Sequence, residues 1–200
     1  MPLKTEQLKE LLYQGLETEI GGQQIYKQAI ESAENAEVKK EWQKYLSETE
    51  DHERILRETF EKIGLDAEVE TPGREVVRSK AEALVAAMKM ALEQAGKSSA
   101  QLVAAESIVE AETKDHQNWE LLGLLLEHIE DKEWKQAIKE AYDQVEEQED
   151  EHLYHTMGWA RELWMESLGA PAVLPPPEEE KSVKTMIGAS RAKQQRDEML

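Results

Sequence analysis

Apolar side chains recur every three to four residues along most of this chain, which is the spacing of helices that bury one face. Two such runs cover residues 3–33 and 37–63, and two more cover residues 98–128 and 132–168. The breaks at 34–36 and 130–131 are so short that the helices on either side must be antiparallel neighbours. A fifth, Ala-rich run over 75–95 joins the two pairs. The pattern predicts two hairpins of long helices connected by a helical linker.

Glycines and N-capping residues mark the expected ends of these helices. Gly64, Gly96 and Gly169 each follow the last periodic residue of a run, as a C-terminal glycine does. Thr5 is the expected N-cap of the first helix, and Ser98 or Ser99 of the fourth. Residues 65–74, with their Pro-Gly pair, are expected to form a loop.

Composition gives the fold class. The chain has 200 residues, 40% of them hydrophobic, with one Phe and an abundance of Ala, Leu, Glu, Gln and Lys. We therefore expect an all-α fold: an antiparallel four-helix bundle over residues 1–169, with an additional helix in the crossover. Residues 170–200 begin Pro- and Glu-rich and are expected to form an extended linker and a flexible tail.

Charge and cysteine content exclude several functions. The formal net charge of −19 would repel nucleic acids and anionic membranes. Without cysteine, the chain cannot form disulfides, Fe–S clusters, cysteine-ligated zinc sites or a cysteine nucleophile. No apolar run reaches the length of a membrane span, and the N-terminus has no signal-peptide core, so cytoplasmic residence is the expectation.

The chemistry is concentrated in the motif Glu149-x-x-His152. A spacing of three places a carboxylate and an imidazole on one helix face, where both can reach one metal ion. His52, in the second run, continues an apolar face in the same way. Each of these two helices follows one that carries an acid on its buried stripe.

Those two acids belong to an internal repeat. Glu19 is followed seven residues later by Tyr26, and Glu112 seven residues later by Trp119. By helical geometry Glu19 and Glu112 lie on the buried stripes, whereas Glu17 points nearer the polar side. A buried carboxylate needs a counter-charge, and bound cations are one answer, with iron or manganese suited to carboxylate and imidazole ligands. Buried Lys, Arg or Tyr partners, and ordinary hydrogen-bonded core histidines, are the alternatives.

These residues together resemble the ferritin-like superfamily, and rubrerythrin-type diiron proteins in particular. That family carries a Glu on each of the first and third bundle helices, with an aromatic residue later in the helix, and Glu-x-x-His on each of the second and fourth. The resemblance covers about residues 8–168. It implies two iron ions, with manganese as an alternative, held by Glu19, His52, Glu112, Glu149 and His152. It also implies an oxidoreductase acting on Fe(II), peroxide or O₂, in a homo-oligomer. The chain lacks a rubredoxin module, so an external protein would have to donate electrons.

One position departs from the family pattern. Thr49 stands three residues before His52, where the family has its bridging Glu. Glu48 could substitute as a metal ligand, because residues four apart also share a helix face, and His116, one turn beyond Glu112, could be recruited. Alternatively, one metal position is lost and the protein is a non-enzymatic metal-binding or structural relative.

Two further features of the sequence each allow two interpretations. Gly21-Gly22 weakens the first helix, and either close helix approach or room for a substrate would explain it. Residues 185–191 loosely resemble the C-terminal docking peptides by which ferritin-like cargo enters encapsulin shells. A shell protein is therefore a candidate partner, and an unstructured terminus is the alternative.

Overall fold

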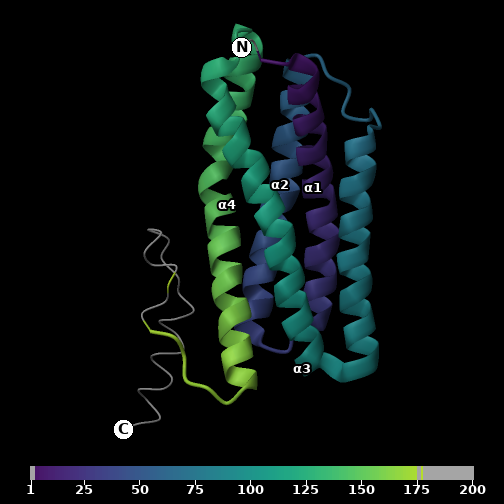
Figure 1. Cartoon of the computed structure of the whole chain (residues 1–200), viewed down its shortest axis with the longest axis vertical. Coiled ribbons are helices and arrows are strands. Elements are labelled where there is room, and N and C mark those ends of the chain that lie inside the picture. Colours follow the sequence, from purple (N-terminus) through teal and green to yellow (C-terminus); the bar gives the residue numbers. More distant parts are fainter. Residues whose placement is uncertain (1–2, 175–176, 178–200) are drawn as a thin grey trace.

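The computed structural model describes residues 3–174 and 177, and this part of the chain is an all-α bundle (Figure 1). Its elements are α1 (Thr5–Ser32), α2 (Ala36–Lys62), α3 (Pro72–Leu125), a 3-10 turn η1 (Leu126–His128) and α4 (Lys132–Ser167). The predicted helical hairpins and the helical linker are confirmed. The docking segment suggested at 185–191 lies outside the described residues.

Helix α3 contains both the linker and the third bundle helix. Gly96 alone leaves helical geometry, with φ 76° and ψ 178°, a conformation that favours glycine. The first half (72–95) runs along the outside of the bundle beside α1, and the second half (97–125) returns through the bundle (Figure 1). The predicted N-cap at Ser98 or Ser99 is wrong, because the helix resumes directly after Gly96 and both serines lie inside it.

Side-chain caps fix the starts of α2 and α4, whereas α1 begins without one. Asn35 accepts hydrogen bonds from the backbone N–H groups of Glu37 and Val38, and Asp131 caps α4 in the same way. The predicted N-cap at Thr5 is wrong. The N-cap of α1 is Lys4, whose side chain makes no capping bond, so Thr5 is the first helical residue.

The bundle core consists of two apolar clusters separated along the helix axes. One contains Leu12, Phe60 and Ile138 and the other contains Trp42, Met88 and Ile108, all 0–1% exposed. A layer of buried polar side chains lies between them on α1, α2, α3 and α4. The two clusters stabilise the bundle on both sides of this layer and keep water away from it.

Helix α1 is buried on more than its bundle face. It packs against α2 and against both halves of α3, while α4 packs against α2 and α3, so α1 and α4 lie diagonally. Because the linker half of α3 covers α1, Glu17 is 2% exposed and pairs with Arg74 and Arg78, each at 2.8 Å. This corrects the prediction that Glu17 faces the polar side. None of the helices in the described part of the chain has an apolar stretch long enough to cross a bilayer.

Candidate metal centre

The buried polar layer holds five of the seven residues that the sequence offered as metal ligands. Glu19 comes from α1, His52 from α2, Glu112 from α3, and Glu149 and His152 from α4. Each of the five is 0–4% exposed. Four helices therefore direct carboxylates and imidazoles into one dry layer of the bundle.

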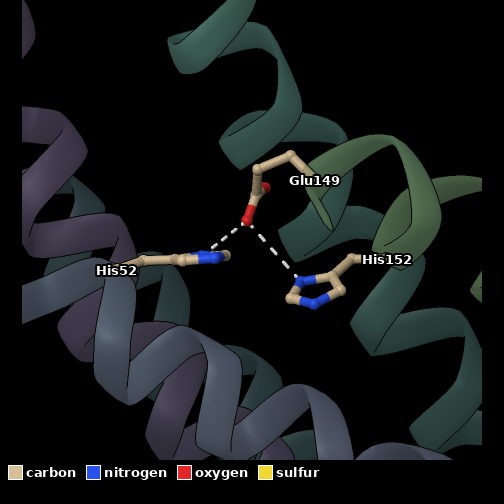
Figure 2. A group of neighbouring side chains, drawn as sticks. All are labelled: His52, Glu149 and His152. Atoms are coloured by element: carbon tan, nitrogen blue, oxygen red, sulfur yellow. Dashed lines mark ion pairs between the residues drawn. The ribbon is translucent and has the colours of Figure 1, made fainter. Parts of the chain in front are cut away.

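Glu149 lies at the centre of this group. Its Oε1 is 2.9 Å from Nδ1 of His52 and 3.5 Å from Nδ1 of His152 (Figure 2). The two imidazoles are stacked, with ring centroids 5.6 Å apart and an interplanar angle of 27°. One carboxylate of α4 thus faces the same ring nitrogen of both histidines.

The other two glutamates extend the arrangement to either side. Oε2 of Glu19 lies 3.7 Å from Nδ1 of His52, and Oε2 of Glu112 lies 3.7 Å from Nδ1 of His152. The site therefore has two similar halves, each with one imidazole and one further carboxylate, that share Glu149. This matches the internal repeat seen in the sequence.

Aromatic residues bind the outward oxygens of these glutamates across the bundle. The Trp119 indole N–H on α3 donates to Oε1 of Glu19 on α1 at 2.9 Å, and the Tyr26 hydroxyl on α1 donates to Oε1 of Glu112 on α3 at 2.7 Å. Each aromatic thus donates its hydrogen bond to the glutamate of the other repeat, not to the glutamate of its own helix. The sequence relates each aromatic to the glutamate seven residues before it in its own helix and gives no sign of this exchange.

The outward nitrogens of the imidazoles are also occupied. Nε2 of His52 donates to Oε1 of Gln148 at 2.8 Å, and Nε2 of His152 donates to Oε2 of Glu48 at 3.0 Å. Both partners are oxygen atoms, so Nε2 carries a hydrogen in either protonation state. Nδ1 of each ring is therefore the atom left to bind a proton or a metal ion.

Six buried atoms in this layer make no hydrogen bond among the described residues, and four of them have only the ion-pair contacts between imidazole and carboxylate given above. They are Oε2 of Glu19, Nδ1 of His52, Oε2 of Glu112, Oδ1 of Asp115, Oε2 of Glu149 and Nδ1 of His152. Buried polar atoms in proteins are nearly always hydrogen-bonded, so six such atoms without a hydrogen bond in one layer need an explanation. All six are oxygen or imidazole nitrogen atoms, which are ligands of iron and manganese.

Asp115 is the member that sequence reasoning missed. It is 5% exposed, and its carboxylate groups with those of Glu19 and Glu149, with one oxygen of each within 4.8 Å of the others. A second such group contains His52, Glu149 and His152, so Glu149 belongs to both. The signal was present in the sequence, because Asp115 follows Glu112 at the spacing that relates Glu149 to His152.

The two residues considered as replacements for the missing family Glu lie outside the inner group. The side chain of Glu48 is 18% exposed, binds the outward nitrogen of His152 and lies 3.5 Å from the Lys44 ammonium group. His116 pairs with Asp150 at 3.2 Å, away from the layer's interior. Thr49 itself is buried at 3% exposure. The structure therefore places Glu48 where it orients His152.

Electrostatics shows that the layer has an excess of negative charge. Burial, together with the charges of Glu112 and Glu19, raises the pKa of Glu149 to about 7, and burial raises that of Asp115 well above its usual value. Burial alone would lower the pKa of His52, but Glu19 and Glu149 raise it to about 11. Without a metal the layer retains protons, which bound cations would displace.

Comparison with known proteins adds no family to this geometry. No family model, curated protein or solved structure matches the chain.

Proposed function

We propose that the bundle interior binds two divalent metal ions, most simply iron, and that the protein is a diiron-type oxidoreductase acting on Fe(II), peroxide or O₂. The observation that carries the proposal is the convergence, in one buried layer, of six oxygen and nitrogen atoms that make no hydrogen bond. The reaction class comes from the resemblance to ferritin-like proteins. That resemblance rests on the positions of Glu19, His52, Glu112 and the Glu149-x-x-His152 motif.

The charges of the layer support two ions. Glu19, Glu112, Asp115 and Glu149 bring four negative charges when ionised, and four positive charges from two divalent ions would balance them with both imidazoles neutral. Glu19 and His52 would hold one ion, and Glu112 and His152 the other. Glu149, which faces both imidazoles, is the best candidate for the bridging ligand.

Bound iron would supply the redox chemistry towards O₂ or peroxide. The chain's own residues orient the ligands: Trp119 and Tyr26 hold the glutamates, and Gln148 and Glu48 fix the imidazoles. Such outer hydrogen bonds commonly change metal affinity or activity 10- to 100-fold when removed. The apolar clusters on both sides exclude bulk water from the layer.

Metal content and Fe(II) oxidation test the proposal. Protein refolded or purified with iron should contain about two ions per chain by elemental analysis, and should accelerate aerobic Fe(II) oxidation followed by near-ultraviolet absorbance. Glu149→Gln should lose both properties. Glu147→Gln, on the exposed side of the same helix, should keep both. Absence of stoichiometric metal together with no protein-dependent oxidation would overturn the proposal.

A second candidate is a metal-binding or structural protein without turnover. Thr49 favours it, because the position of the family's bridging carboxylate carries a buried hydroxyl instead. This candidate predicts bound metal without acceleration of Fe(II) oxidation or peroxide reduction. The same two measurements therefore distinguish the two candidates.

A further inference from the structure

A cavity of about 560 Å³ lies outside the metal layer, where α1 meets both halves of α3. Thr18, Gly22 and Ile25 line it from α1, and most of its remaining lining is apolar, including Val77 and Leu84 of the linker half. A volume of this size is typical of small-molecule sites, which commonly measure about 300–1,000 Å³. The linker helix therefore forms a partly open cavity of usable size against the bundle.

The paired glycines of α1 account for the shape of this cavity. A Cβ atom on Gly21 would lie 2.7 Å from the Cβ of Ala81, so glycine lets the linker half of α3 approach closely. A Cβ atom on Gly22, which also lines the cavity, would lie 3.3 Å from the Thr49 methyl group, a tight contact with α2. Close helix approach therefore explains both glycines, on the α3 side for Gly21 and on the α2 side for Gly22.

Two lysines give the cavity a charged edge. Lys80 lines it from the linker half of α3 and Lys114 from the bundle half. Neither lysine has an ion pair with a carboxylate among the described residues, although Lys114 donates to the side chain of Asn118. Glu110 also lines the cavity. In a chain with a net charge of −19, two ammonium groups without a carboxylate partner beside an apolar cavity are complementary to an anion with an apolar body.

We propose that this cavity binds an amphiphilic anion: a hydrocarbon chain that lies against the apolar lining, with a carboxylate or phosphate head between Lys80 and Lys114. The proposal needs only the cavity and the two lysines, so it is independent of metal in the bundle interior. A free fatty acid and a lipid phosphate share this chemistry.

Calorimetric titration of the full chain, metal-free and metal-loaded, tests the proposal with octanoate, decanoate and dodecanoate. Affinity should rise about fourfold per buried methylene. Dodecanoate should bind more tightly than dodecanol and dodecyltrimethylammonium. Tighter binding of the cationic amphiphile would indicate adsorption to the acidic surface and would overturn the proposal. The affinity for dodecyl phosphate, compared with that for dodecanoate, shows whether the site prefers a phosphate or a carboxylate head group.

Variants locate the binding in the cavity. Ala83→Trp places an indole at an exposed position of the lining and should abolish binding, whereas Ala87→Trp, exposed on the same helix outside the lining, should not. Lys80→Gln and Lys114→Gln should each weaken dodecanoate about threefold to tenfold without affecting dodecanol, and Lys89→Gln should change neither. Unaltered dodecanoate affinity in Ala83→Trp or in the double lysine variant would refute the site.

Discussion

Replacement of Glu149 by Gln should have opposite effects on the stability of the metal-free and the metal-loaded protein. Glu149 is 1% exposed, and burial with neighbouring carboxylates raises its pKa from 4.5 to about 7. A carboxyl whose pKa is higher in the folded state destabilises the fold above its unfolded pKa. At about 1.4 kcal/mol per pH unit this amounts to about 3 kcal/mol at pH 8. Gln has the same shape without the charge, so the metal-free variant should gain up to about 3 kcal/mol.

The metal-loaded protein should respond in the other direction. An ion at about 100 times its dissociation constant stabilises the folded state by about 2.7 kcal/mol, and two ions by about 5 kcal/mol. Glu149 faces both imidazoles, so its replacement should remove most of that gain. For a chain of this size about 1 kcal/mol moves the melting temperature by 2–4 °C, so metal should raise that of the wild type by about 10–20 °C.

Differential scanning calorimetry in EDTA and in Mn(II), or in anaerobic Fe(II), measures both effects. Glu147→Gln serves as the matched control, because Glu147 is exposed on the same helix. If neither Mn(II) nor Fe(II) changed the melting temperature of the wild type relative to EDTA, the metal site would be refuted. A Glu149→Gln variant destabilised equally with and without metal would show that Glu149 is a structural partner of His52 and no ligand.

Three further outcomes are expected. Metal-free protein should lose stability from about pH 5 to pH 9 in melting experiments, because the raised pKa of Glu149 costs stability above 4.5. The pKa of His52 rises to about 11 in the folded state, so the stability that protonated His52 contributes is fully present below about pH 6.5 and is lost as the pH rises towards 11. A melting temperature that rises between pH 5 and pH 9 would contradict both expectations. Thr49→Glu and Thr49→Gln should both keep about two ions per chain by elemental analysis, because Asp115 already supplies the fourth carboxylate; a gain in occupancy in Thr49→Glu alone would favour a degenerate site. Glu17→Gln should cost about 3 kcal/mol in urea unfolding, because Arg74 loses its buried partner, while metal content stays unchanged.

The features predictable from the sequence are those fixed by neighbouring residues. Helix periodicity is local, and Gly64, Gly96 and Gly169 do adopt positive φ at the ends predicted for their helices. The inward positions of Glu19 and Glu112 follow from the same periodicity. Local spacing therefore predicts which side chains face the core of a helix pair.

The features that escaped prediction depend on contacts between distant segments. Glu17 looks solvent-facing on an isolated α1, and it is buried only because the linker half of α3 brings Arg74 and Arg78 onto that face. The donation from Trp119 to Glu19 joins residues 100 positions apart and has no local signature. When a third element covers a helix, it buries residues that the packing of two helices alone would leave exposed.

Asp115 bears on the absence of a carboxylate at Thr49, because it supplies a carboxylate to the same buried layer. The family pattern described from the sequence contains four carboxylates and two imidazoles, and so does this layer when Asp115 is counted. Under the proposed assignment, Asp115 on α3, where it lies near Glu19 and Glu149, would stand in for the carboxylate that α2 lacks. The total negative charge would then equal that of the family pattern, so the site would keep the capacity to neutralise two divalent ions, and an ion near His52 would gain a ligand from a different direction. This argues for a rearranged dimetal site in preference to one that has lost a metal.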